Sequence, residues 1–373
     1  MDDSAVPQPA DDPSLLDLMM EDLRAADPQF QPTNYWAVYE KRFLPQLKKH
    51  GLRDFRRQKD LVFRSFGAVD FDHPFAELVF RKSPAWRRFP LRHVPGVAAL
   101  AARLDRALGS HLWLIDGMDM ETYVRLGYSF AKDYASVGRA RPLSAFSMSM
   151  VGNPPGVVRI EGNLYTRQMI QYYLQYAYVS RYVDLEQMRV VAELGSGMGR
   201  QTEILYKLHP QAGYLLFDIP PQIYVAEQYL KAVFPGRVVS YRETRSWNDL
   251  DTVAGGFIYI FGNHKMPLLR GTATDLFWNS ASFHEMEPDV VREYLRFVNA
   301  SAKWAYLSQN LKGGGMANRP GQPGILRATS LEDYRSGLPD FDLVEMQPTL
   351  RINGKPLLDH GMIFRRRERA GET

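Results

Sequence analysis

Three glycines at alternating positions form the most informative pattern in this sequence. Gly195, Gly197 and Gly199 follow a β-rich run, Arg189–Leu194, which contains the acidic Glu193. Glycine lets a ligand approach the backbone where a side chain would collide, and the helix-compatible stretch that follows would present free N–H groups. The segment therefore predicts a strand, a turn and a helix that together bind a nucleotide-like ligand.

The spacing of these glycines distinguishes between two kinds of ligand. Dinucleotide-binding folds prefer G-x-G-x-x-G, with the pyrophosphate at the helix start, whereas this chain has G-x-G-x-G behind an acidic residue. A second strand-like run, Tyr214–Phe217, ends at Asp218, where such folds place the carboxylate that accepts both ribose hydroxyls. Either element alone also fits a tight turn beside a surface aspartate, but the two in this order predict a nucleoside site.

Short β-rich runs alternate with amphipathic segments between residues 189 and 311, and this alternation predicts a parallel sheet with helices on both faces. The helical patterns are Gln222–Phe234 and Pro288–Ala300. Two strand-like runs near the C-terminus, with a turn at Asn353 and Gly354, predict an antiparallel edge pair. The strand candidates are Arg189–Leu194, Tyr214–Phe217, Gly256–Phe261, Asp275–Ser282, Lys303–Gln309, Phe341–Met346 and Gly361–Arg366. The third strand of the series is either Gly256–Phe261 or a further run, Arg237–Arg242.

The chain before residue 185 is mainly helical in its patterns. Apolar residues recur at helical spacing in Ser14–Ala26, Asn34–His50, Val97–Leu108 and Met120–Ser136, and a basic, irregular segment, Phe80–His93, lies among them. We therefore expect an α/β, Rossmann-like domain over residues 185–373, preceded by a mainly helical cap over 14–184 and a disordered tail over 1–13. The cap is expected to contact the substrate and to be a possible dimerisation region.

Three stretches carry a resemblance to a known family: Glu193–Arg200, Phe217–Tyr224 and Asp275–Met286, with a weaker fourth at Gly152–Pro155. The first is common to a whole superfamily, whereas the Asp-x-Pro-Pro of the second and the Asn-x-x-Ser-x-x-Glu-Met of the third are more specific. With them, residues 150–311 resemble the bacterial sugar O-methyltransferases, a branch of the class I methyltransferases that use S-adenosylmethionine (SAM).

The resemblance implies SAM as cofactor and a hydroxyl of a sugar or glycosylated natural product as acceptor. The cofactor brings the reactivity of such a transfer, so the protein must supply alignment and a base for the hydroxyl proton. At the matching positions, the expected cofactor contacts are Glu193, Gly195, Ser196, Gly197, Gly199, Asp218 and Ile219.

His284 and Glu285 are the candidates for the base. Both come directly after the run Asp275–Ser282, at the sheet edge where the carboxyl ends of parallel strands would hold the cofactor. Histidine has the ordinary pKa closer to neutrality, whereas Glu285 matches the family pattern. One of them or both would act, and the alternative is a helix start that packs on the sheet or complements a helix dipole.

Polar residues in a strand that should be buried on both faces indicate a ligand or a hydrogen-bond network. On this ground Asn279 and Ser280 are expected to contact the cofactor, and Ser282 the acceptor. Asn310, at the end of Lys303–Gln309, is a further acceptor candidate.

The loop after Gly256–Phe261 supplies the remaining cofactor candidates. Asn263 and His264 would contact adenine if this run is the third strand of the sheet. A surface loop is the alternative.

A tyrosine-rich segment, Tyr165–Tyr182, precedes the glycines. Its members Tyr165, Tyr172 and Tyr176 follow helical spacing, and such a face could stack on a sugar or an aromatic ring of the acceptor. A helix–helix or subunit interface would be equally rich in tyrosine. We expect both uses, with these three residues at the substrate.

Composition narrows the classes further. The chain has 373 residues, 45% apolar and 24% charged side chains and a net charge of +4, which fits about two globular domains and does not indicate nucleic acid or a membrane surface as a partner. With no cysteine, a cysteine nucleophile and thiolate metal sites are excluded, and no histidine–carboxylate spacing indicates a metal.

The N-terminus is acidic and contains prolines, unlike a signal peptide, and no apolar run approaches the roughly 20 residues of a membrane span. We therefore expect a cytoplasmic protein. Three alternatives stay open: an N- or C-methyltransferase of a non-sugar natural product, a non-catalytic protein that keeps the fold, and an NAD-dependent oxidoreductase, which would need the other glycine spacing.

Overall fold

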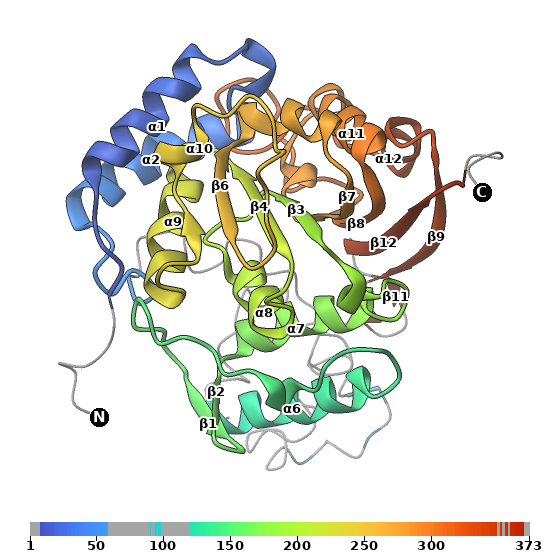
Figure 1. Ribbon diagram of the computed structural model, residues 1–373. Coiled ribbons are helices and arrows are strands. Elements are labelled where there is room, and N and C mark those ends of the chain that lie inside the picture. The colour runs from blue at the N-terminus through green and yellow to red at the C-terminus, as the bar shows by residue number, and fades with distance from the viewer. Residues whose placement is uncertain are drawn as a thin grey trace.

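The centre of the computed structural model is an eight-stranded sheet with helices on both faces (Figure 1). The structure describes residues 8–58, 90, 94, 96–97, 120–348, 351–352, 355–356 and 359–368. In spatial order the strands are β5 (Val238–Val239), β6 (Ile258–Gly262), β4 (Gly213–Asp218), β3 (Val190–Leu194), β7 (Thr274–Ser280), β8 (Ala302–Asn310), β12 (Asp359–Arg366) and β9 (Phe341–Pro348).

The chain enters this sheet at its centre, in β3, continues to β4, reaches the edge strand β5, fills the position between them with β6, and returns to β7 on the other side of β3. The strands from β5 to β8 are parallel, whereas β12 is antiparallel to β8 and to β9. In doubly wound sheets, ligands bind outside the carboxyl ends of the strands where the winding direction reverses, which here is between β3 and β7. The predicted fold class, an α/β Rossmann-like sheet with an antiparallel C-terminal edge pair, is confirmed.

The third strand of the series is β6, in the run Gly256–Phe261, because it pairs with β4 along its length. The competing run, Arg237–Arg242, gives only the two-residue edge strand β5 and the start of the short helix α10 (Tyr241–Thr244). A small hairpin, β10 (Arg351–Ile352) with β11 (Lys355–Pro356), lies between the edge strands, and the turn predicted at Asn353 and Gly354 is outside the described residues.

Both faces of the sheet are apolar because the side chains of each strand alternate between two separate cores. On β7, Trp278 packs in the first core and Phe277 in the second. The first core is covered by α7 (Arg167–Val179), α8 (Arg200–Leu208) and α9 (Pro220–Val233), and the second by η6 (Asn263–Gly271), α11 (Pro288–Ser301) and α12 (Leu331–Gly337).

Helices from the N-terminal part of the chain pack at opposite ends of the molecule, α1 (Pro13–Ala25) and α2 (Asn34–His50) at one end and α6 (Met120–Ala135) at the other (Figure 1). These three helices agree with the predicted helices to within a residue, whereas the short η2 (Pro28–Phe30) was not predicted. Helix α1 packs on α9 and α6 packs on α7, next to the hairpin of β1 (Val158–Ile160) and β2 (Asn163–Tyr165). The predicted helix Val97–Leu108 and the basic segment Phe80–His93 lie almost wholly outside the described residues.

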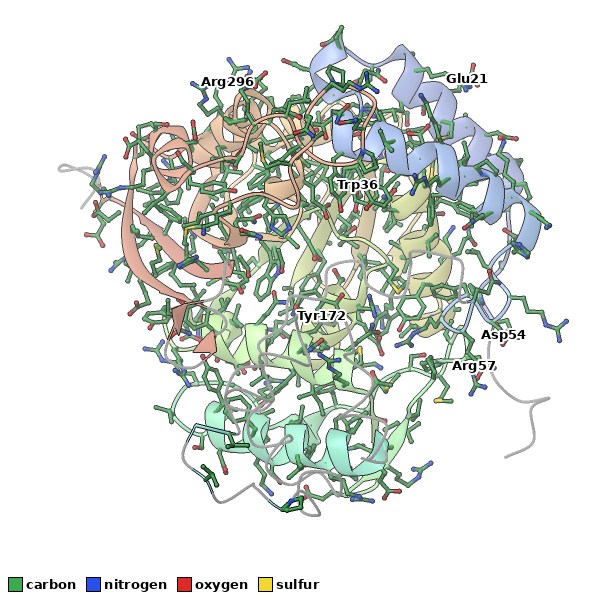
Figure 2. The ribbon with its side chains drawn as sticks, turned by 180° about the vertical axis from the view of Figure 1, so that it is seen from behind. Glu21, Trp36, Asp54, Arg57, Tyr172 and Arg296 are labelled. Carbon is green, nitrogen blue, oxygen red and sulfur yellow. The ribbon has the colours of Figure 1, made fainter. Side chains whose placement is uncertain are left out.

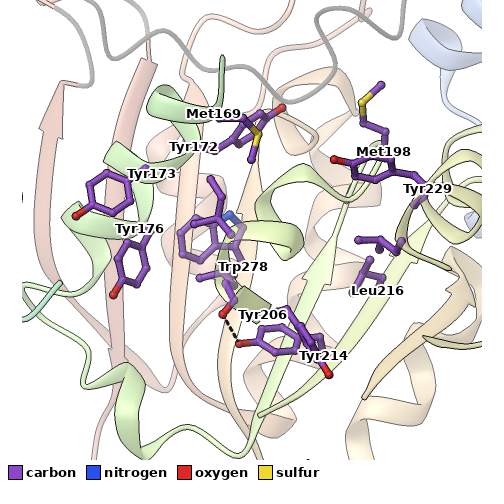
Figure 3. Packing of buried hydrophobic residues seen from close by; sticks show 14 of the residues in the cluster. Met169, Tyr172, Tyr173, Tyr176, Met198, Tyr206, Tyr214, Leu216, Tyr229 and Trp278 are labelled. Atoms are coloured by element: carbon purple, nitrogen blue, oxygen red, sulfur yellow. Dashed lines mark hydrogen bonds between the residues drawn. The ribbon is translucent and has the colours of Figure 1, made fainter. Parts of the chain in front are cut away.

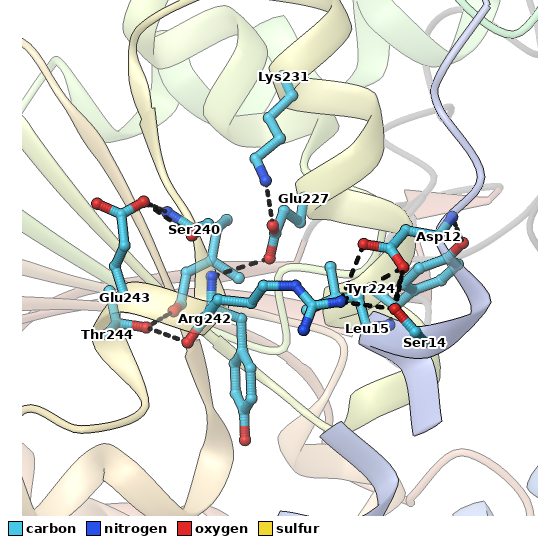
Figure 4. Close-up of polar contacts among 12 residues, drawn as sticks. Asp12, Ser14, Leu15, Tyr224, Glu227, Lys231, Ser240, Arg242, Glu243 and Thr244 are labelled. Carbon is cyan, nitrogen blue, oxygen red and sulfur yellow. Dashed lines mark hydrogen bonds and ion pairs between the residues drawn. The ribbon is translucent and has the colours of Figure 1, made fainter. Parts of the chain in front are cut away.

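Polar contacts hold α1 against α9 and α10 (Figure 4). Asp12 caps α1 through its side chain, which accepts the Leu15 N–H at 3.0 Å, and the Asp12 N–H donates to the Tyr224 hydroxyl at 2.8 Å. Arg242 on α10 forms an ion pair with Asp12 at 3.1 Å. The start of the described chain is thereby fixed beside the sheet, and the segment between α1 and α2 crosses its carboxyl edge.

Candidate functional site

A small cavity, open to solvent on one side, lies at the carboxyl ends of β3 and β4. Its walls come from the two strand ends, the loop after β6, the start of α11 and the segment between η2 and α2. Four of the predicted cofactor residues, Gly195, Asp218, Ile219 and Asn263, lie on these walls together.

The glycine loop has a left-handed backbone, with φ of 77° at Gly195, 56° at Gly197 and 79° at Gly199. A Cβ on Gly195 would lie 2.3 Å from the Cβ of Ser282, and one on Gly199 would lie 2.7 Å from Leu230. The protein's own packing therefore already demands glycine at two of the three positions, so the evidence for a ligand must come from the polar groups around the loop.

Two buried carboxyl groups flank this loop. Asp218 accepts the N–H groups of Gly197 and Ile219, each at 2.8 Å, and burial raises its pKa to about 7. Glu193 accepts the Thr202 hydroxyl at 2.6 Å, and burial, with the nearby charge of Asp218, raises its pKa to about 7. Since each carboxylate oxygen can accept more than one hydrogen bond, both groups retain capacity for a ligand.

Glu285 brings a third carboxyl group to the same place, on the short helix η7 (Phe283–Glu285) that follows β7. Its pKa is raised to about 8, mainly by burial and also by the negative charge of Asp218, while the nearby polar groups of Tyr35 and Trp36 lower it. Among the described residues, no cation acts on Glu285, Asp218 or Glu193. Asp218 lies on the cavity wall and its charge acts on both other groups, so three carboxyl groups without a described cation lie near one another, which favours a positively charged ligand.

His284 is arranged differently from its neighbour. Its Nδ1 accepts the N–H of Asn310 at 3.1 Å, and burial lowers its pKa to about 4. The ring is therefore neutral at pH 7 with its proton on Nε2, and its one nitrogen lone pair already accepts a hydrogen bond. In this arrangement the histidine can donate to a ligand but is poorly placed to take a proton, which leaves Glu285 as the better candidate for the base.

Asn279 holds the neighbouring loops together. Its Nδ2 donates to the carbonyl of Leu194 at 2.9 Å and to the hydroxyl of Ser282 at 2.6 Å, and its Oδ1 accepts from Gln309 at 2.7 Å. Asn310, besides its bond to His284, accepts the Lys312 N–H at 2.9 Å through its side chain. The structure thus engages Asn279 and Ser282 in protein contacts that fix the glycine loop to the end of β7.

Ser280 lies at the carboxyl end of β7 and pairs in register with Ser308 on β8. Both residues are buried, and neither hydroxyl has a hydrogen-bond partner among the described residues. The buried hydroxyl of Ser196, in the glycine loop, also has no hydrogen-bond partner among the described residues. Buried hydroxyls without partners are costly, so these three are candidates for contact with a bound molecule.

Asn263 has one polar atom left for a ligand. Its Nδ2 donates to the carbonyl of Phe30 at 2.7 Å and to the Tyr294 hydroxyl at 2.9 Å, whereas no described residue donates to its buried Oδ1. This acceptor on the cavity wall matches the amino group of adenine. His264 packs against Gly262, whose added Cβ would lie 2.7 Å from the histidine Nδ1, and it is absent from the cavity wall.

The tyrosine-rich segment lies in the core and is absent from the cavity wall (Figure 3). The Tyr165 hydroxyl donates to the carbonyls of Leu143 at 2.8 Å and Phe146 at 3.0 Å. The Tyr176 hydroxyl accepts the N–H of Arg141 at 2.8 Å. Both side chains are fully buried, and Tyr172 is buried with the guanidinium of Arg200 5.1 Å from its ring, so all three side chains pack inside the protein in this structure.

The segment from Phe30 to Trp36 was not predicted as part of the site. It closes one side of the cavity, and Figure 2 shows Trp36 where the N-terminal helices meet the sheet. The available signal was the trio Tyr35, Trp36 and Tyr39 at the start of α2, since the buried residues of that helix, Phe43 and Leu47, lie only in its second half.

No group of three or more histidine or carboxylate side chains is arranged to hold a metal in the described ranges. Over the same residues, no helix is both long enough and apolar enough to cross a membrane.

Comparisons with known proteins give structural neighbours only. No family model matches this chain, and no curated protein sequence matches it. Among solved structures, it is similar to magnesium protoporphyrin IX methyltransferase (ChlM) from Synechocystis PCC 6803 with bound SAH, at 14% identity over 53% of this chain and 83% of that chain, with a TM-score of 0.39. The mitomycin 7-O-methyltransferase MmcR matches at 14% identity over 87% of this chain and 82% of that chain, with a TM-score of 0.34.

A third neighbour, the pyocyanin biosynthetic protein PhzM, matches at 12% identity over 54% of this chain and 56% of that chain, with a TM-score of 0.36. These neighbours are methyltransferases or biosynthetic proteins by name. At this level of similarity they assign neither a substrate nor an activity to this chain, so any function must be argued from its own cavity.

Proposed function

We propose that this chain is a SAM-dependent methyltransferase that transfers a methyl group to a hydroxyl of a sugar or a glycosylated natural product. The observation that carries the proposal is a group of three neighbouring carboxyl groups with no described cation acting on any of them: Asp218 lies on the cavity wall, and its charge acts on both Glu193 and Glu285. SAM carries a positive sulfonium and a positive amino group, and both would be stabilised among buried carboxylates.

The residues on the cavity wall also fit the nucleoside half of SAM. Asp218 is at the strand end where its carboxylate would accept the two ribose hydroxyls, and the unpaired Oδ1 of Asn263 would accept from the adenine amino group. Ile219, which is 8% exposed, offers an apolar side chain to the adenine ring from the residue next to Asp218.

SAM would supply an electrophilic methyl group for an in-line displacement by the acceptor hydroxyl. Glu285 would accept the proton that this hydroxyl loses, since its raised pKa of about 8 makes it a stronger base than an ordinary carboxylate. His284 would donate from Nε2, and the network of Asn279, Ser282 and Gln309 would hold the loop in place.

A hydroxyl-rich acceptor is supported by the polar groups beyond the base. The buried hydroxyls of Ser280 and Ser308 lie side by side at the carboxyl ends of β7 and β8, and both can donate to and accept from sugar hydroxyls. The resemblance of Asp275–Met286 to the sugar O-methyltransferases points to the same class of acceptor. An amine acceptor is the second candidate, because it would need no strong base.

The test is incubation of the protein with isotope-labelled SAM and a panel of glycosides and amines, followed by mass spectrometry to locate the added methyl. We expect transfer to a glycoside hydroxyl, with loss of transfer in Glu285→Gln. Transfer only to amines would overturn the sugar acceptor. Calorimetric titration with SAM and with its demethylated product tests the cofactor separately. If neither binds, SAM is not the cofactor of this protein.

A further inference from the structure

The segment from Phe30 to Asn34, which joins η2 to α2, forms one wall of the cavity, and we call it the strap. The strap residues on the cavity wall are Gln31, Pro32 and Thr33, and the end of β4 contributes Asp218 to the same cavity. A nucleoside held by Asp218 would therefore lie against the strap as well as against the sheet.

One end of the strap is anchored by apolar packing. The buried ring of Phe30 lies 6.0 Å from the ring of Tyr294 and 6.4 Å from that of Phe297, both on α11. The Phe30 carbonyl also accepts the Nδ2 of Asn263 at 2.7 Å. Moving this end would expose aromatic surface to water, so we expect it to stay in place.

The other end of the strap is held by polar contacts. The Nδ2 of Asn34 donates to the carbonyls of Gln322 at 3.0 Å and Gly324 at 2.7 Å. The Oδ1 of Asn34 accepts the N–H of Gly321 at 2.7 Å. All three partners belong to the loop that follows β8. Water can replace such hydrogen bonds at a modest net cost, so this is the end that can open.

The loop that Asn34 contacts is itself fixed. The Ile325 N–H donates to the carbonyl of Gly315 at 2.9 Å, and the Ala317 N–H donates to the carbonyl of Ile325 at 2.8 Å. The Gly314 N–H donates to the carbonyl of His284 at 2.8 Å, which ties the loop to η7. The loop therefore presents its backbone groups at fixed positions, and Asn34 attaches the strap to them.

Little apolar surface opposes movement at the Asn34 end. The side chains from Gln31 to Asn34 are only partly buried, and the buried residues of α2, Phe43 and Leu47, lie in its second half. The remaining printed tie of the strap at this end is a single hydrogen bond, from the Thr33 hydroxyl to the carbonyl of Glu285 at 3.1 Å. The first turn of α2 can therefore move with the strap.

We propose that the strap is part of the cofactor site: it covers the nucleoside held at Asp218, and the cofactor and its demethylated product dissociate when the Asn34 end opens. Asn34 is a positioning residue, because its partners are backbone groups of the loop and it is absent from the cavity wall. The inference rests on the proposed function, because the bound molecule is the cofactor of that reaction.

The first experiment measures dissociation rates of the demethylated product from the wild type, Asn34→Ala and Asn163→Ala by surface plasmon resonance. Asn163 is the matched control, because its Nδ2 donates to the carbonyl of Ser144 at 2.8 Å, away from the cavity wall. Loss of the Asn34 bonds should raise the dissociation rate about tenfold, and Asn163→Ala should leave it unchanged.

A purely structural role for Asn34 predicts a different result. Asn34→Ala would then lower the unfolding temperature while the product dissociates at the wild-type rate. Because the cavity is open to solvent on one side, an unchanged rate would indicate that ligands leave there without movement of the strap, and it would overturn the proposal.

The second experiment locks the strap covalently. The chain contains no cysteine, so Asn34→Cys together with Gln322→Cys introduces one pair that oxidation joins and reduction separates. The reduced double variant, which lacks the Asn34 bonds, should release the product faster than the wild type, whereas the oxidised form, with its cross-link verified by mass spectrometry, should release it more slowly. Equal release rates in the two states would overturn the proposal.

These measurements separate the strap from the proposed function. If the wild type binds neither SAM nor its demethylated product, the cofactor is wrong and the role of the strap with it. If both bind but no acceptor is methylated, the transfer reaction is wrong while the release rates still test the strap. If binding and transfer occur and Asn34→Ala releases the product at the wild-type rate, only the strap is wrong.

Discussion

The cavity at the carboxyl ends of β3 and β4 and the tyrosine-rich segment Tyr165–Tyr182 are both dense in polar groups, but they use those groups in opposite ways. Around the cavity, the Oδ1 of Asn263 has no described donor, and Asp218 and Glu285 have raised pKa values. In the tyrosine-rich segment, the hydroxyls of Tyr165 and Tyr176 are bonded to the backbone of the protein.

The difference shows what separates a candidate site from a polar core. Residue type is equally suggestive in both regions, since tyrosine, aspartate and asparagine all bind ligands. What differs is whether unpaired polar atoms and raised carboxyl pKa values coincide with a cavity, since the buried side chain of Gln175 in the tyrosine-rich segment also has no described partner but is absent from the cavity wall. Unpaired acceptors and uncompensated charges are destabilising in the free protein, so the Oδ1 of Asn263 and the carboxyl group of Asp218, which share one cavity wall, are the groups that a ligand there would satisfy.

Among the variants that test this comparison, Glu285→Gln should have the largest effect on the transfer rate. If the carboxyl group is the base, its replacement by a neutral amide should lower the transfer rate by roughly 10²- to 10³-fold, while binding of the demethylated product changes little. Single-turnover rates and calorimetric titration measure the two effects. Glu161→Gln, at an exposed site far from the cavity, is the control. A Glu285→Gln rate within threefold of the wild-type rate would show that Glu285 is not the base.

Asp218→Asn tests the second carboxyl group through affinity. Loss of two hydrogen bonds from ribose hydroxyls to a charged acceptor should weaken SAM binding by on the order of 100-fold in calorimetric titration. The affinity should fall in parallel for SAM and its demethylated product, since both carry the ribose. Unchanged affinity for both would place the nucleoside elsewhere.

The same variant tests the raised pKa of Asp218. Its folded-state pKa of about 7 lies above the unfolded value of about 4, so the folded state binds more protons between these limits. The stabilisation is therefore present at low pH and lost as the pH rises through about 7. Thermal unfolding without ligand should show a decline from pH 5 to pH 8 that is smaller in Asp218→Asn, and equal declines would contradict the raised pKa.

Asn263→Ala should have a smaller effect, about tenfold on SAM affinity, because it removes one neutral acceptor of the adenine amino group. The residue also bonds Phe30 and Tyr294. Tyr294→Phe is therefore the matched control: it removes a protein partner of Asn263 and leaves the Oδ1 acceptor in place. If both variants weaken binding equally, the loss comes from loop positioning and not from adenine.

Sequence patterns were sufficient for the parts of this molecule that local rules determine. The alternation of strands and helices placed the sheet, and the glycine spacing with Asp218 placed residues that share one cavity wall. They could not choose between His284 and Glu285, since that choice depends on a backbone N–H from Asn310, on another strand. Nor could they place Thr33 beside Glu285, because the hydrogen bond from the Thr33 hydroxyl to the Glu285 carbonyl joins positions 252 residues apart.

The smallest expected effect concerns the tyrosine-rich segment. Tyr165→Phe and Tyr176→Phe should each lower the free energy of unfolding by about 1 kcal/mol, because each removes a buried hydrogen bond to the backbone. Neither should change SAM affinity or the KM for the acceptor, since both side chains are fully buried and absent from the cavity wall. Denaturant unfolding and steady-state kinetics measure the two quantities. A rise in the acceptor KM with unchanged stability would indicate that these tyrosines contact the substrate. The tyrosine-rich segment would then belong to the binding site, as the cavity does.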